Sequence, residues 1–287
     1  MLGRAARIAV FVASGLPVVG FVACGGSSET EPGSEIAAEA GPDPDAAPAV
    51  VLDDASPPDA EADAGSTDAA IDAPAKGFCA SRSPAPRFCD DFDDADLDDD
   101  WTVQTVLNGA PILDTSAATS LPASFGVETI AIDSDESAHV HLRANVAGTP
   151  TGHVVLAFEM MLATATYTRG TIAIATLDVS PDHFFTLYLR DADPDAPAPV
   201  LEETSGATTT RHVLSKLPPA VVWTRVTIDV DVAGAKASVL WGNEKVLDQA
   251  AIAAGPASAP RIRVGAVYVY GPADPFEARF DDVTLDF

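Results

Sequence analysis

The stretch HVVLAFEMML, from His153 to Leu162, has an apolar side chain at every second position. Successive side chains of an extended chain point to opposite faces of a sheet, so Val154, Leu156, Phe158 and Met160 share one face. A strand with one apolar face covers a core with that face. The stretch therefore predicts a half-buried β-strand.

The same period of two recurs along the chain. It is seen in HVHLRANV (139–146), HFFTLYLRD (183–191), WTRVTIDVDV (223–232), RIRVGAVYVY (261–270) and FDDVTLDF (280–287). Segments rich in Gly, Pro, Asn and Asp separate these runs, as expected for turns. No long stretch has the 3.6-residue period of an amphipathic helix. The pattern predicts an all-β fold over residues 77–287, with a two-sheet antiparallel β-sandwich favoured over a barrel.

Residues 1–23 have the features of an export signal. Arg4 and Arg7 precede an apolar run that is too short and too interrupted to span a membrane comfortably. The run ends in FVACGG, which resembles a bacterial lipobox because the small Ala23 precedes a cysteine. That resemblance implies that Cys24 is lipidated, for example with palmitate, and becomes the mature N-terminus. The alternative is an ordinary signal peptide cleaved elsewhere, with Cys24 incidental.

Residues 24–76 have the composition of a disordered tether. After Cys24 the segment has thirteen acidic residues against one lysine and no aromatic side chain. Such a segment buries little surface and repels itself, so we expect it to stay disordered and extended. Gly25 and Gly26 replace the aspartate that retains some lipoproteins in the inner membrane. We therefore expect an exported protein of the cell envelope, lipid-anchored in the outer membrane.

The formal net charge of −27 bears on the choice of partner. Nucleic-acid binding requires basic surface that neutralises phosphates, and the sequence shows no basic patch. An acidic balance favours solubility and does not identify a ligand.

The chain contains three cysteines. If Cys24 carries lipid, Cys79 and Cys89 are left to pair across the proline-containing loop CASRSPAPRFC. An exported protein meets an oxidising environment, which permits a disulfide. A metal site at the two cysteines is the alternative, although no second pair or nearby histidine supports it.

Three short motifs carry a resemblance to a known fold family. An early FCDDF followed by Trp101, a central WTRVTIDVD and a closing FDDVTLDF are similar to the concanavalin-A-like lectin/glucanase sandwich, a LamG-like jelly roll. In that family the closing strand often lies beside the opening one. The resemblance extends over residues 88–287. With the lipobox and the acidic tether, the chain also resembles lipoproteins of predatory or soil delta-proteobacteria of the myxobacterial type. This second resemblance implies location and fold only.

The resemblance also implies a structural calcium ion. In many carbohydrate-binding jelly rolls the opening and closing strands hold calcium, which prefers six to eight oxygen ligands. Asp91 or Asp93 from the opening and Asp281 or Asp282 from the end would supply the carboxylates. The alternative is a solvated acidic turn without metal.

Sugar binding needs aromatic platforms beside hydrogen-bonding groups. If the sandwich is right, Tyr188, Arg190, Glu202 and Trp241 are the predicted ligand residues. The alternative is that the aromatic side chains only complete the core.

No complete catalytic constellation is present. A retaining glucanase of this fold needs paired carboxylates on one face, whereas Glu159 is alone and adjacent Glu202 and Glu203 would point to opposite faces. His139 and His141 share a strand face, which could hold a metal but more often places two histidines at the surface. We therefore expect a non-catalytic module that binds a polysaccharide or a surface protein. A structural or protein-interaction module is the second hypothesis, and a divergent glycan hydrolase or lyase is the third.

Overall fold

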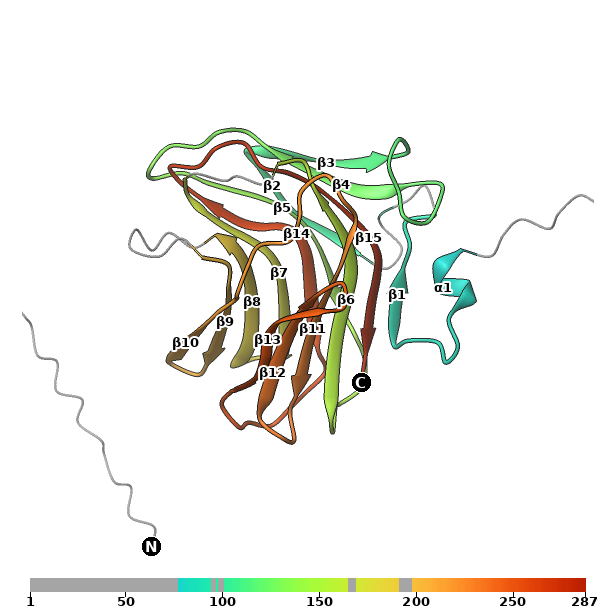
Figure 1. The fold of residues 1–287 in the computed structure, drawn as a ribbon, viewed down its shortest axis with the longest axis vertical. Helices are drawn as coiled ribbons and strands as arrows, with labels where there is room; N and C mark the ends of the chain where they lie inside the picture. The colour runs from blue at the N-terminus through green and yellow to red at the C-terminus, as the bar shows by residue number, and fades with distance from the viewer. Residues whose placement is uncertain (1–76, 94–96, 98–100, 165–168, 191–197) are drawn as a thin grey trace, which may run out of the picture. The chain divides into compact units, whose positions relative to one another are not determined.

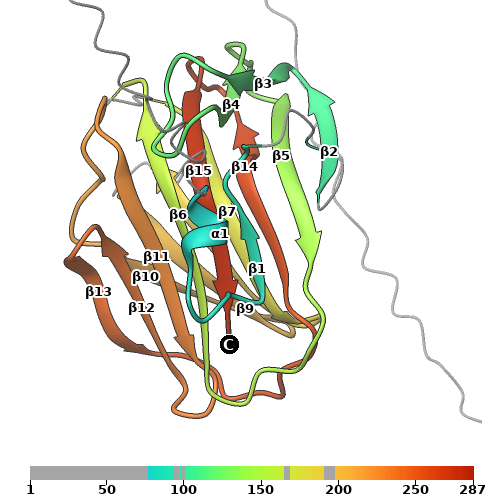
Figure 2. The same ribbon diagram turned by 90° about the vertical axis from the view of Figure 1, so that its right-hand side faces the viewer.

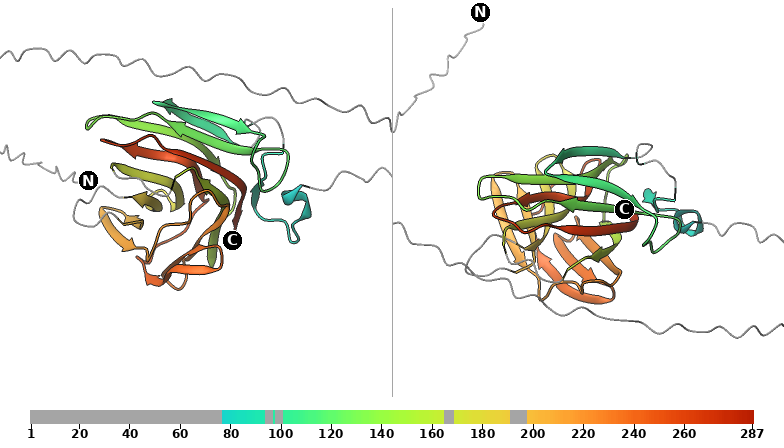
Figure 3. Two further views of the ribbon diagram at one scale, coloured as in Figure 1. Left: turned by 45° about the horizontal axis from the view of Figure 1, so that its top comes forward. Right: turned by 90° about the horizontal axis from the view of Figure 1, so that it is seen from above.

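The computed structural model describes residues 77–93, 97, 101–164, 169–190 and 198–287. The predicted signal peptide and tether, and with them Cys24, lie outside these residues. The described chain forms two antiparallel sheets packed face to face, as Figures 1 and 3 show. The predicted two-sheet antiparallel β-sandwich is confirmed.

The first sheet has eight strands. Its order is β13 (Glu244–Ala251), β12 (Lys236–Trp241), β11 (Thr224–Asp231), β6 (His153–Leu162), β15 (Glu277–Asp286), β4 (Ser124–Thr129) and β3 (Gly109–Asp114), with β1 (Phe88–Asp90) paired beside β15. β4 pairs with residues 277–280 of β15, whereas β1 pairs with residues 283–285. The closing strand therefore lies beside the opening one, as the resemblance implied.

The second sheet has seven strands. Its order is β10 (Thr208–Val213), β9 (Val200–Ser205), β8 (His183–Arg190), β7 (Thr171–Ser180), β14 (Arg261–Tyr270), β5 (Ser137–Asn145) and β2 (Thr102–Leu107). Several strands that are neighbours in this sheet, such as β14 and β7, are far apart in the sequence. The chain therefore crosses repeatedly from one sheet to the other, as in a jelly roll.

The apolar face of each strand points between the sheets. Val154, Leu156, Phe158 and Met160 of β6 are fully or almost fully buried, as the alternation predicts. Phe185, Leu187 and Leu189 of β8 belong to the same core and enter it from the second sheet. The polar residues between these positions are left on the two outer faces of the sandwich.

The N-terminal part of the described chain contributes β1 to the eight-stranded sheet and packs against that sheet. A single helical turn, α1 (Phe78–Ser81), precedes β1, and Figure 2 shows both against β15. Cys79 and Cys89 form a disulfide that links α1 to β1, which confirms the predicted pairing.

Removing this disulfide should lower the free energy of unfolding by about 2–3 kcal/mol, because a ten-residue cross-link restricts the unfolded chain. The test is urea denaturation of a variant carrying Cys79→Ser and Cys89→Ser, compared with the oxidised protein. Reduced wild-type protein serves as the control and should show the same loss. Identical unfolding midpoints for the variant and the oxidised protein would contradict this prediction.

Candidate functional site

A row of polar side chains crosses the outer face of the seven-stranded sheet. The strand register aligns Arg143 (β5), Arg263 (β14), Thr176 (β7), Thr186 (β8), Glu202 (β9) and Arg211 (β10) as direct cross-strand neighbours. We call these six residues the polar row. Neighbouring strands lie about 4.8 Å apart, so the polar row extends over roughly 25 Å.

Hydrogen bonds fix the middle of the polar row. Arg263 Nη1 donates to Thr176 Oγ1 at 3.0 Å. Asp178, which is 5% exposed, forms an ion pair with Arg261 and lies 4.0 Å from Arg263 Nη1. Side chains of β7 therefore fix the orientation of both guanidinium groups on the outer face of the sheet.

An aromatic group lies beside the polar row on the same face. The rings of Tyr268 and Tyr270 are stacked at 5.9 Å, and Tyr268 lies 5.3 Å from the ring of His139. The register places the small Ala173 between Tyr268 and Tyr188. We call Tyr188, Tyr268, Tyr270 and His139 the aromatic row.

The polar atoms of the aromatic row have defined partners. His139 Nδ1 donates to the carbonyl of Val267 at 2.8 Å, which fixes the imidazole. The hydroxyl of Tyr188 donates to Glu202 Oε1 at 3.4 Å. Burial, followed by the negative charge of Glu202, raises the pKa of Tyr188 to about 12. Tyr188 consequently remains a hydrogen-bond donor at physiological pH.

His141 lies between the two rows and is only 7% exposed. Burial, together with the positive charges of Arg263, His139 and Arg143, lowers the pKa of His141 to about 4. The imidazole is therefore neutral at physiological pH.

The structure places three of the four predicted ligand residues on this face. Tyr188 and Glu202 are in contact, and Arg190 belongs to the same face of β8 by its alternation with Leu189. Trp241 is elsewhere: it is 4% exposed, belongs to the core, and donates from Nε1 to the carbonyl of Lys216 at 2.9 Å. The prediction that Trp241 contacts a ligand on this surface is therefore wrong. Trp241 points into the core, as does Val239, which lies two positions before it on the same face of β12.

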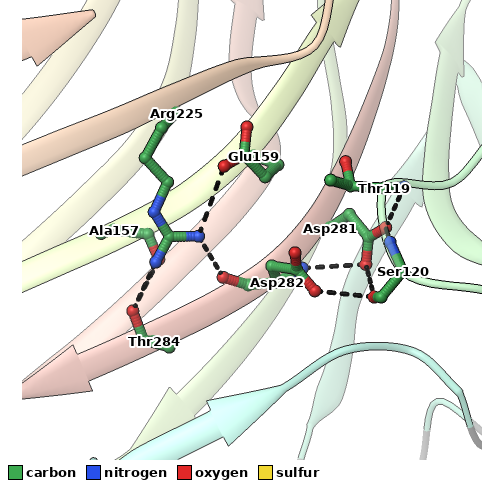
Figure 4. A network of polar contacts seen from close by, with 8 residues as sticks. All are labelled: Thr119, Ser120, Ala157, Glu159, Arg225, Asp281, Asp282 and Thr284. Carbon is green, nitrogen blue, oxygen red and sulfur yellow. Dashed lines mark hydrogen bonds and ion pairs between the residues drawn. The ribbon is translucent and has the colours of Figure 1, made fainter. Parts of the chain in front are cut away.

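A second polar network lies on the outer face of the eight-stranded sheet (Figure 4). Arg225 donates to the carbonyl of Asp282 at 2.7 Å and to Thr284 Oγ1 at 3.0 Å, and lies 3.9 Å from Glu159 Oε1. Its guanidinium also lies 5.5 Å from the centre of the Phe78 ring, so it joins α1 to the sheet.

Three of the four residues predicted to hold calcium, Asp91, Asp281 and Asp282, have atoms at this network. Asp281 Oδ2 accepts hydrogen bonds from the amides of Thr119 and Ser120, and the Ser120 hydroxyl donates to Asp282 Oδ1 at 2.7 Å. The same hydroxyl lies 3.5 Å from the carbonyl of Asp91. Burial, followed by the charge of Asp282, raises the pKa of Asp281 to about 7.

Asp91 and Asp93 also have other roles. Asp91 Oδ2 accepts a hydrogen bond from the amide of Cys79, and both carboxylates lie close to Gly77. In the described part of the chain, no three His, Cys, Asp or Glu side chains are grouped so that they could hold a metal ion. A calcium ion would therefore need backbone and hydroxyl oxygens in addition to the carboxylates, and the calcium site stays a prediction.

Comparison with solved structures supports the fold. The endo-β-1,4-glucuronan lyase from the fungus Trichoderma reesei superposes with a TM-score of 0.54 at 12% identity, over 70% of this chain and 95% of that one. The cellulose induced protein Cip1 superposes with a TM-score of 0.52 at 14% identity, over 69% and 96% of the two chains. These likenesses show a shared jelly-roll sandwich.

The comparisons by sequence give no relative. No protein-family model matches the chain, and no curated protein matches it. Within the described residues, no helix is both long and apolar enough to cross a membrane.

Proposed function

We propose that this chain is an exported, lipid-anchored protein of the cell envelope whose β-sandwich binds a glycan without cleaving it. The binding surface is the outer face of the seven-stranded sheet. The observation that carries the proposal is the aromatic row, Tyr188, Tyr268, Tyr270 and His139, aligned beside the polar row.

The two rows offer the two kinds of contact that a sugar requires. Aromatic rings pack against the apolar face of a pyranose, and hydroxyl, carboxylate and guanidinium groups bond its hydroxyls. Tyr188 and Glu202, which are already in contact, would supply a donor and an acceptor at one point of the surface. The side chains are carried by paired strands, so the surface is formed before the ligand arrives.

The structural neighbours are consistent with this proposal. One is named as a lyase of a β-1,4-linked glucuronan and the other as a protein induced by cellulose. At 12–14% identity they support a sandwich of the same kind, and the choice of a glycan ligand here rests on the side chains of this chain.

Export and anchoring remain part of the proposal on the grounds of the sequence. Lipidation of Cys24 would fix the protein to the outer membrane, and the acidic tether would hold the sandwich away from the lipid surface. A domain placed in this way meets extracellular polysaccharides and the surface proteins of other cells.

The position of two glutamates favours binding over hydrolysis. Glu159 lies on β6 of the eight-stranded sheet, whereas Glu202 lies on β9 of the other sheet. These two carboxylates are therefore not the closely spaced pair of a retaining glycosidase. New reducing ends or unsaturated ends appearing in a polysaccharide incubated with the protein would instead favour the hydrolase or lyase hypothesis.

Replacing Tyr268 by alanine should weaken glycan binding about tenfold, because the central ring of the aromatic row is lost. The ligand is first found on a glycan array, and affinities are then measured by calorimetry. Tyr268→Phe keeps the ring and should bind nearly as the wild type does. An array without any bound glycan, or equal affinities for the wild type and Tyr268→Ala, would contradict the proposal and leave the protein-interaction hypothesis.

A further inference from the structure

Positive charge is concentrated on one part of this otherwise acidic protein. Arg143 and Arg263 are direct cross-strand neighbours, and Arg261 lies two positions from Arg263 on the same face. Like charges placed opposite each other destabilise a sheet. The chain as a whole has a formal net charge of −27, so a cluster of arginines on one face differs sharply from the average.

The counter-charge for this cluster is incomplete. Asp178 pairs with Arg261 and lies at the limit of ion-pair distance from Arg263. None of the described carboxylates forms an ion pair with Arg143. The guanidinium of Arg143 is thus a neighbour of a second guanidinium, that of Arg263, and has no carboxylate partner among the described residues.

Two polar atoms at the same place are buried without a hydrogen-bond partner in the described part of the chain. Nδ1 of His141 and Nε of Arg143 are buried and have no hydrogen-bond partner among the described residues. The two residues are two positions apart on β5, so they share the outer face. A buried polar group without a partner costs about 1–3 kcal/mol, and such groups in a native structure call for an explanation.

We propose that Arg143, Arg263 and His141 bind the anionic groups of an acidic glycan, a class that includes uronate-containing and sulfated polysaccharides. This inference rests on the proposed glycan-binding function and adds the chemical class of the ligand. The guanidinium fork matches the two oxygens of a carboxylate or the oxygens of a sulfate. The sugar rings would lie on the aromatic row, with their anionic groups toward the arginines.

The surroundings suit such a ligand. Arg263 is oriented by Thr176 and Asp178 before binding, which reduces the entropy lost when an anion is bound. A pocket lined by Asn145, Asp178, Ser180 and Arg261, among others, lies at one end of the arginine cluster and leaves room for a substituent.

The test compares anionic and neutral oligosaccharides of the same linkage and length. A β-1,4-linked oligoglucuronate and a cello-oligosaccharide of equal length share their linkage, and the first has a carboxylate where the second has a hydroxymethyl group. Sulfated cello-oligosaccharide is the third probe. We expect at least one anionic probe to bind about tenfold or more tightly than the neutral one, and to weaken as salt is added.

Variants connect that preference to the arginines. Arg143→Gln should lower the affinity for the anionic probe about tenfold, whereas Arg143→Lys should retain part of it. Lys245→Gln removes the same charge from β13 on the other sheet, where Lys245 pairs with Asp248, and should change nothing. Thermal melts confirm that all variants are folded.

The possible results distinguish failure of the acidic-glycan inference from failure of the proposed glycan binding. Preference for the glucuronate or for the sulfated probe, lost in Arg143→Gln, supports the inference and identifies the anionic group. Equal or tighter binding of the neutral probe, or equal effects of Arg143→Gln and Lys245→Gln, overturns it while glycan binding stands. If no probe binds and the glycan array is also empty, both proposals fail.

Discussion

Replacing Arg225 by methionine should lower the free energy of unfolding by about 3 kcal/mol. Methionine keeps most of the apolar volume of the side chain and removes the charge and the donors. The loss should appear in urea denaturation as a lower midpoint with an unchanged slope.

The size of this effect follows from what Arg225 joins. It donates to Asp282 and Thr284 of β15 and lies 3.9 Å from Glu159 on β6 (Figure 4). It also packs against the ring of Phe78 in α1. Removing it leaves the carbonyl of Asp282 without its donor and Glu159 without its neighbouring positive charge. Leaving one partner of a half-buried ion pair in place is costly, because the remaining charge is poorly solvated.

A double-mutant cycle checks the cause. In a Glu159→Gln background the abandoned carboxylate is absent, so Arg225→Met should cost clearly less than in the wild type. Arg169→Met, at an exposed ion pair with Asp274, is the matched control and should cost less than about 1 kcal/mol. Equal costs for Arg225→Met in both backgrounds would show that Glu159 does not contribute.

The alternation of the sequence was sufficient to predict the layers of the fold. Each period-two run has a simple physical meaning, because only one of two strand faces can be buried. His141 and Arg143 alternate with Val140 and Leu142, so their position on the outer face was readable from the sequence. The pairing of FDDVTLDF with the opening strand also agreed with the family resemblance.

The candidate site was harder to predict, because it depends on register and on an irregularity. Arg143 and Arg263 are neighbours only because β5 pairs with β14, and no local pattern specifies that register. Strict alternation in RIRVGAVYVY would put Tyr268 on the opposite face from Arg263. A β-bulge between Ala266 and Val269 inserts one extra residue, and it brings the tyrosine to the face of the arginines.

Adding calcium should stabilise the folded protein by about 4 kcal/mol when the free ion exceeds its dissociation constant a thousandfold. The gain should be visible as a higher melting temperature, and a chelator should reverse it. Magnesium at the same concentration should have a much smaller effect, because it dehydrates reluctantly and demands a regular octahedron of ligands.

The reason for this expectation is the placement of Asp281 and Asp282. Asp281 is fully buried and Asp282 is 4% exposed, and they are consecutive residues at a bulge in β15 where Asp282 has a φ of 50°. Two adjacent buried carboxylates repel each other, and the amides of Thr119 and Ser120 offset only part of that cost. A calcium ion bound by these carboxylates, the Ser120 hydroxyl and the Asp91 carbonyl would offset more of it.

Variants test whether a calcium ion offsets the repulsion between the carboxylates of Asp281 and Asp282. Asp282→Asn removes one predicted ligand charge and should abolish most of the calcium-dependent shift, whereas Asp248→Asn, on an exposed part of β13, should leave it intact. If calcium does not change the melting temperature of the wild type, the calcium prediction is wrong and the two carboxylates keep their mutual repulsion. In that case Asp282→Asn should itself stabilise the protein, because it relieves the repulsion with Asp281.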